Sequence, residues 1–220
     1  MFIKELSILS GNLPETEKFY TEILNLKIRH KSQDYISFQA GKTVLTFVRS
    51  SQEKPKYHFA FNIPNNRLSD ALSYLESTVE ILPGESGEKI VDFRNWNARS
   101  VYFKDTTGNI VEFIARFDLD NQNRIGSAEP LILSISEIGI SVDDVLKESL
   151  DIKSHYAVDF FTKQKPAESF AALGDDNGLL IFSKYRRHWF PTRYPSEKLW
   201  TRVTFEAERR IHEITWYNQA

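Results

Sequence analysis

The chain has 220 residues, of which 41% are hydrophobic and 26% are charged, a composition typical of a folded globular protein rather than a disordered one. Its formal net charge of −2 gives no electrostatic reason to expect binding to nucleic acid or to an anionic membrane. The sequence contains no cysteine, which excludes disulfides, thiolate metal sites and a cysteine nucleophile.

The first predicted unit has the element order βαβββ. A strand is predicted at 3–9, and Asn12 and Pro14 predict the start of a helix as an N-cap residue and a first-turn proline. Apolar residues at helical spacing predict the buried face of this helix: Phe19, Tyr20, Ile23 and Leu24. The three remaining strands are predicted at 27–30, 35–39 and 43–49.

The second predicted unit repeats this order. A strand at 57–63 and a helix at 67–77 are followed by a strand near 79–82 and a loop at 83–88 that contains two glycines. Further strands are predicted at 90–94, 99–104 and 109–115. The sequence DTTG at 105–108 predicts a tight connection between the last two, because its glycine can adopt a positive φ.

Residues 119–130 are polar and turn-rich, and they predict a linker between a complete module pair at 1–118 and a degenerate pair at 131–220. Beyond the linker, a strand at 132–142 and a short helix at 144–150 begin a third unit. Four more strands are predicted at 169–173, 179–183, 200–206 and 211–216. The last unit has little room for a helix.

A recurring pattern of strand, polar turn and amphipathic helix links these units. Alignment of their openings places Glu5, His58 and Glu137 at the same point, the first two 53 positions apart (58 minus 5), a spacing typical of repeated structural units. Glu112 lies on the last strand of the second unit, between apolar residues. A carboxylate buried there needs a partner, since an unpaired buried charge is costly. The pattern therefore indicates a duplicated fold that closes around a metal or ligand cavity.

Three segments carry a family resemblance: LPETEKFYTEILNLKI after the first strand, HFAFNI at the start of the second unit, and VYFKDTTGNIVEFIAR at its end. In these segments the first 116 residues resemble the vicinal oxygen chelate superfamily, which includes glyoxalase I, fosfomycin and bleomycin resistance proteins, and extradiol dioxygenases. The resemblance implies an α+β fold of βαβββ modules with cup-shaped mixed sheets. It also implies a metal inside the cup, held by first and last strands of the modules.

The resemblance implies metal ligands residue by residue. His58 and Glu112 match two of the four ligand positions, and Glu5 stands where many members have histidine. Thr46 stands where glyoxalase-type members have glutamate, which argues against glyoxalase activity in particular. We therefore expect Glu5, His58 and Glu112 to be the ligands, with one of the two carboxylates or a metal-bound hydroxide as catalytic base. The C-terminal half has no histidine at an equivalent point, so no second metal site is expected there.

Two readings of these residues stay open. Imidazole and carboxylates suit Fe, Mn, Ni, Co or Zn, so the set favours a divalent metal, and no organic cofactor is indicated. The alternative is a buried hydrogen-bond or ion-pair network, or side chains that face solvent.

Other residues are candidates for substrate binding. In FRNWNARS (93–100), Trp96 and Arg99 could cover the cup and orient an anionic or aromatic substrate, and Tyr102 could line the cavity beside Thr46. For each the plainer alternative is a surface hairpin or ordinary core. The basic and aromatic segment 184–198 superficially suggests nucleic-acid binding, but it is short and contains two prolines. We expect a loop that caps a cup or contacts a second subunit.

The function expected from these observations is that of a metal-dependent enzyme, a lyase, isomerase or ring-cleavage dioxygenase, that acts on a small oxygenated molecule. The alternative is a non-catalytic protein that binds or sequesters an antibiotic-like molecule. A small molecule is the expected partner, with neither nucleic acid nor membrane, and a homodimer stays open. A cytoplasmic location is expected, because no apolar run of about 18 residues and no secretory signal are visible.

Overall fold

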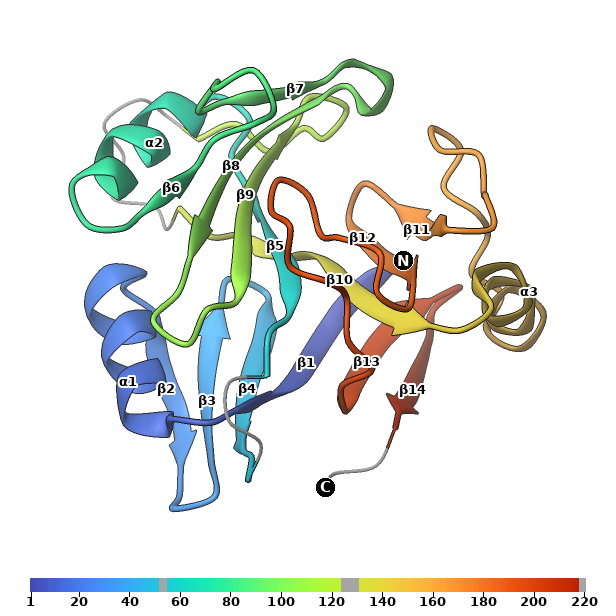
Figure 1. Ribbon diagram of the computed structural model, residues 1–220, viewed down its shortest axis with the longest axis horizontal. Helices are drawn as coiled ribbons and strands as arrows, with labels where there is room; N and C mark the ends of the chain where they lie inside the picture. Colours follow the sequence, from blue (N-terminus) through green and yellow to red (C-terminus); the bar gives the residue numbers. More distant parts are fainter. Residues whose placement is uncertain (52–54, 124–130, 218–220) are drawn as a thin grey trace.

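The computed structural model describes residues 1–51, 55–123 and 131–217. It confirms the predicted α+β class, with few helices and two strongly curved, mixed sheets (Figure 1). In the described ranges, no helix has the length and apolar character needed to cross a bilayer.

The first module has the predicted βαβββ order, and the second follows it with one additional short strand, Val91–Phe93. The elements of the first are β1 (Phe2–Ser10), α1 (Leu13–Lys18), the π-helical turn η1 (Phe19–Ile23), β2 (Lys27–Lys31), β3 (Tyr35–Ala40) and β4 (Thr43–Arg49). Those of the second are β5 (His58–Ile63), α2 (Leu68–Glu76), β6 (Ile81–Leu82), β7 (Val91–Phe93), the short η2 (Arg94–Trp96), β8 (Ala98–Lys104) and β9 (Ile110–Arg116). The predicted N-cap is confirmed, because the Asn12 side chain accepts a hydrogen bond from the Glu15 amide at 3.2 Å.

The third and fourth modules are shorter. They consist of β10 (Ser134–Val142), α3 (Val145–Tyr156), β11 (Phe170–Asp175) and β12 (Gly178–Lys184), followed by the hairpin β13 (Thr201–Ala207) and β14 (Arg210–Trp216). Helix α3 runs six residues beyond its predicted end at 150. Its second half is polar, and Ile152 alone supplies a buried apolar side chain there, which leaves little periodicity in the sequence.

The four modules pair in an order that crosses the chain. The six-stranded sheet has the order β14-β13-β1-β4-β3-β2 and combines the fourth module with the first (Figure 1). The eight-stranded sheet has the order β11-β12-β10-β5-β9-β8-β6, with β7 beside β8, and combines the third module with the second. In both sheets the first strands of the two modules meet antiparallel at the centre, β1 with β13 and β5 with β10.

This pairing bears on the division expected at 119–130. Each sheet takes strands from both sides of that segment, so residues 1–118 do not form a closed sheet of their own. Most of the predicted linker, 124–130, lies outside the described residues.

Alternation along the central strands separates a core face from a cup face. On β5, Phe59 and Phe61 pack into the core between the sheets, whereas His58 and Ala60 face the opposite side. Both faces of this strand are buried. The cup of the eight-stranded sheet is therefore covered, and polar side chains on it are kept from water.

A close backbone approach fixes the first module against the start of β10. Gly41 has a φ of +58°, and a Cβ at this position would lie 2.0 Å from the carbonyl oxygen of Leu133. The Lys42 amide donates to that same carbonyl at 2.8 Å, and the Ile135 amide donates to the Thr43 hydroxyl at 3.1 Å. Only glycine fits the turn, and the turn holds the third module in register for the site.

Candidate metal centre

Three adjacent strands bring together His58, Glu112 and Glu137. Ala60 on β5 lies opposite Glu112 on its parallel neighbour β9, and opposite Glu137 on its antiparallel neighbour β10. Residues opposite one another share a face, and His58 lies two residues from Ala60 on that face. The small side chain of Ala60 leaves space between the two carboxylates.

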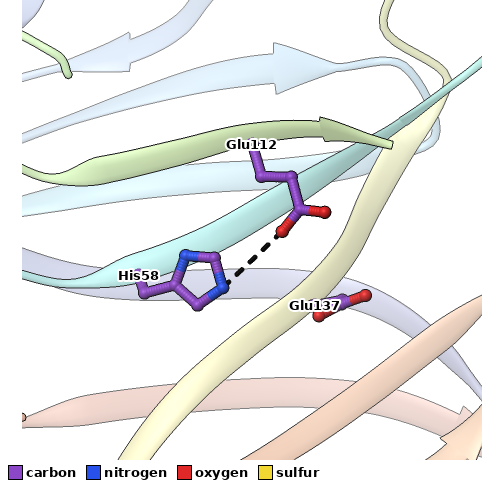
Figure 2. Close-up of side chains that lie close together, drawn as sticks. All are labelled: His58, Glu112 and Glu137. Atoms are coloured by element: carbon purple, nitrogen blue, oxygen red, sulfur yellow. Dashed lines mark ion pairs between the residues drawn. The ribbon is translucent and has the colours of Figure 1, made fainter. Parts of the chain in front are cut away.

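The three side chains converge on one point (Figure 2). Each offers one ligand atom, and these atoms all lie within 4.8 Å of one another. His58 Nε2 lies 3.6 Å from Glu112 Oε2. The exposed fractions are 7% for His58, 2% for Glu112 and 4% for Glu137. Ligand atoms on one ion, at bond lengths of roughly 2.1 Å, are about 3 to 4.2 Å apart, so small side-chain movements suffice for coordination.

His58 is prepared to act as a ligand. Its Nδ1 lies 3.2 Å from the carbonyl oxygen of Ile110, which can only accept, so Nδ1 carries the proton and donates. The Nε2 lone pair is then left free to face the two carboxylates. Burial lowers the pKa of His58 to about 4, so the ring is neutral at pH 7.

The neighbouring cationic side chains do not neutralise both carboxylates. Burial raises the pKa of Glu112 to about 8, and repulsion from Glu137 adds to the shift. Burial also raises the pKa of Glu137, although the neighbouring guanidinium of Arg116 opposes this. Since His58 is neutral, Glu112 has no cationic side chain in contact with it among the described residues. It must hold a proton or meet a bound cation, and this is the observation by which the residues present fit a metal ion.

Arg116 organises the far side of the centre. It is fully buried, and its guanidinium pairs with Glu137, donates to Asp176 at 3.1 Å and donates to the Ser136 hydroxyl at 3.1 Å. Ser136 is the extra residue of a bulge on β10, which shifts the register between Ile135 and Glu137. The predicted alternative of a buried hydrogen-bond or ion-pair network therefore holds in part: Glu137 has an ion pair with Arg116, whereas Glu112 has a hydrogen bond to Tyr102 but no cationic partner among the described residues.

A cavity of about 400 Å³ opens onto the three side chains. Its other walls are mostly aromatic: Phe93, Trp96, Tyr102, Phe170, Trp189 and Phe190. Ile181 on β12 occupies the fourth position of the centre, because it pairs with Gly139 as Glu112 pairs with Ala60. It supplies an apolar wall there and no ligand atom.

The structure brings together part of the predicted site. His58 and Glu112 meet, and Trp96 and Tyr102 line the same cavity. The prediction that segment 184–198 caps a cup is confirmed, since Trp189 and Phe190 contribute to the cavity wall. Arg99 lies outside this cavity, with its guanidinium near the Phe117 ring on the surface.

Glu5 is the principal correction. It was expected to face inward beside His58, but it is exposed on β1 in the other sheet. Thr46 lies on β4 of that sheet, hydrogen-bonded to Ser37 at 2.8 Å. The alignment of Glu5, His58 and Glu137 was sound, but β5 pairs with β10 and not with β1. Glu137 therefore takes the place expected for Glu5, and the C-terminal half contributes to the centre without a histidine of its own.

Sequence reasoning missed Arg116 and the individual roles of Arg187 and Glu137. A signal existed for Glu137, which aligns with His58 across the repeat. Arg116 gave none, because an arginine at the end of a strand is usually a solvated residue.

Comparisons with known proteins agree with this architecture. A family model described as Glyoxalase/Bleomycin resistance protein/Dioxygenase superfamily matches residues 3–113, just over half of the chain. No curated protein matches the chain in sequence.

Two solved structures share the fold over most of the chain. A "putative dioxygenase" from Bacillus subtilis subsp. subtilis str. 168 has a TM-score of 0.60 at 15% identity, over 90% of this chain and 65% of its own length. A V278E mutant of glyoxalase I from Zea mays has a TM-score of 0.57 at 17% identity, over 83% of this chain and 67% of its own length. The chain thus spans about two thirds of each, and at these identities the likeness is one of fold.

Proposed function

Because this chain belongs to the glyoxalase/bleomycin resistance protein/dioxygenase superfamily, we propose that it is a divalent-metal-dependent enzyme acting on a small oxygenated organic molecule. His58, Glu112 and Glu137 would hold the ion, and the substrate would occupy the aromatic cavity above them. The observation that carries the proposal is a neutral histidine beside two buried carboxylates, one of which has no cationic partner among the described residues.

The donor set limits the metal. One imidazole nitrogen and two carboxylate oxygens suit Fe, Mn, Ni, Co or Zn, and the absence of thiolate disfavours a site built for softer ions. A bound ion would supply a Lewis acid that polarises a substrate oxygen. Three protein ligands and an apolar fourth wall leave room for a substrate with adjacent oxygen atoms.

The side chains around the ion have their own tasks. In the metal-free chain burial raises the pKa of Glu112 to about 8, and a bound cation would take the place of that proton and hold Glu112 as a charged ligand. Arg116 pairs with Glu137, opposes the rise that burial causes in the pKa of Glu137, and orients its carboxylate. The aromatic wall reduces access of water, which strengthens each electrostatic contact inside.

Metal binding by Glu112→Gln tests the proposal, with Glu5→Gln as a matched control on the equivalent strand of the other sheet. After reconstitution with each ion, elemental analysis of the wild-type chain should show about one metal per chain. Glu112→Gln should lose affinity by at least about 100-fold, because it removes a ligand, whereas loss of an outer-shell partner alone costs about 10- to 100-fold. Glu5→Gln should bind as the wild type does. No metal in the wild type, or equal binding by Glu112→Gln, would refute the metal site.

A non-catalytic binding protein is the second candidate, and one feature favours it. Glu137 is already paired with Arg116, and Ile181 stands at a fourth position without ligand atoms. A thermal-shift screen separates the two functions. Stabilisation by Mn, Fe or Ni supports the enzyme, whereas stabilisation by organic ligands alone, with no response to any of the metals, supports the binding protein.

A further inference from the structure

Arg187 is a cation at the cavity with no acidic partner among the described residues. Its side chain lines the same cavity as His58 and Glu112, and its guanidinium carbon lies 5.0 Å from the centre of the Phe170 ring. Partial burial lowers the pKa of Arg187 below its ordinary value, although the guanidinium stays charged at neutral pH. Arg187 is exposed overall, and without an acidic partner its guanidinium is available to bind an anion that enters the cavity.

The loop between β12 and β13 holds Arg187 in place. The Arg187 amide donates to the Lys184 carbonyl at 2.9 Å, and its carbonyl accepts from the Ser196 amide at 2.8 Å. The buried hydroxyl of Ser196 then bonds the Ser141 hydroxyl at 3.0 Å, which fixes the loop to β10. Arg187 is therefore mounted on a braced loop rather than on a free one.

The same loop packs against the metal centre. The Trp189 ring lies 5.4 Å from the His58 ring, and a Cβ on Gly139 would lie 2.6 Å from the Trp189 ring. Gly139 thus leaves the space that allows the indole to form the wall. A flat ligand would fit between such aromatic faces, and a cavity of about 400 Å³ suits a molecule of one or two rings.

The charged side chains at and beside the cavity predict the net charge of its ligand. A divalent ion would balance Glu112 and Glu137, while Arg116 and Lys163 are balanced by their contacts with Asp176 and Asp118. Arg187 is then the one cation without a counterpart among the residues that line the cavity. The cavity would be complete with one additional negative charge.

We propose that the ligand of this cavity is a small aromatic monoanion, whose carboxylate binds Arg187 while its ring lies among Trp189, Phe190 and the facing aromatic side chains. This ligand would direct two adjacent ring oxygens at His58, Glu112 and Glu137, and that orientation rests on the proposed function. The charge balance above rests on it too, because it counts the metal ion, whereas the contact with Arg187 belongs to the protein with or without a metal.

Two probes that differ only in charge test this inference. The full chain, metal-free and Mn(II)-loaded, is titrated calorimetrically with 3,4-dihydroxybenzoate and with its neutral amide, 3,4-dihydroxybenzamide. The acid should bind about 10- to 100-fold more tightly, as expected for a charge-assisted hydrogen-bonded pair. Arg187→Met should bring the acid down to the affinity of the amide and leave the amide unchanged.

Arg186→Met is the matched control, since Arg186 is the preceding residue and does not line the cavity. It should keep the preference for the acid, and Arg187→Lys should keep part of it. Circular dichroism checks that each variant is folded. Equal affinity for acid and amide, no saturable binding of the acid, or a preference that survives in Arg187→Met overturns the inference. If Mn(II) does not bind but the metal-free chain still prefers the acid through Arg187, the metal proposal fails and the anion site stands.

Discussion

The two sheets are built on one plan, yet among the described residues only the eight-stranded sheet carries a candidate metal centre. In both, the first strands of two modules meet antiparallel at the centre and a last strand lies parallel beside each of β1, β5 and β10. Equivalent positions hold Glu5 and Thr46 in the six-stranded sheet, and His58 and Glu112 in the eight-stranded sheet.

The physical difference between the two cups is how far each is shielded from water. Glu5 is exposed, whereas Glu112 is 2% exposed beneath Trp189, Tyr102 and the other aromatic walls. Water solvates the first carboxylate, so it needs no partner. The second is desolvated, its pKa rises, and it acquires the need for a cation or a proton. A shared backbone plan thus offers ligand positions, and the loops above the sheet decide which become a site.

Removal of Arg116 should have the largest effect on stability. Arg116→Met leaves the buried Glu137 without its cation and Asp176 with Lys163 alone, and breaking such a buried pair typically costs about 3 to 5 kcal/mol. Urea denaturation followed by circular dichroism measures it. Arg99→Met, a surface arginine on the adjacent strand β8, should change the free energy of unfolding by less than about 0.5 kcal/mol. Similar losses for both would show that burial of Arg116 does not matter.

Metal affinity should fall as the pH falls. Without metal, the pKa of Glu112 is about 8, so below that pH an ion must displace its proton, and affinity should drop by about tenfold per pH unit. His58, with a pKa of about 4, stays neutral and adds nothing between pH 6 and 8. Competition titrations with a chelator of known pH dependence measure the slope. An affinity that is constant from pH 8 to pH 6 would contradict the raised pKa of Glu112.

Alanine substitutions at equivalent strand positions should affect stability differently in the two cups. Gly139 on β10 has no room for a Cβ beneath Trp189, so Gly139→Ala should destabilise the chain by about 1 to 3 kcal/mol and shift its tryptophan fluorescence. Ser7 is the equivalent residue on β1, where a side chain is already accommodated, and Ser7→Ala should be close to neutral. An unchanged emission spectrum in Gly139→Ala would show that Trp189 does not depend on this space.

Much of the fold was predictable, because local chemistry determines it. The Asn12 cap, the alternation on β5 and the glycine turn after β8 each depend on neighbours in the chain. Helix α3 was predicted too short, since its polar second half depends on packing around Ile152 alone. Of the three candidate ligands, only the pair His58 and Glu112 was predictable, because their strands β5 and β9 belong to one module.

By itself, the sequence determined the repeated modules, the equivalence of Glu5, His58 and Glu137, and the donor types at those points. The tertiary structure decided which of them meet, because strand pairing depends on how whole modules bury their apolar faces. The pairing of β5 with β10 places Glu137 beside His58 and leaves Glu5 in water. The tertiary structure also decided the chemistry of these carboxylates, because burial raises the pKa of a carboxylate only when packing removes the water around it.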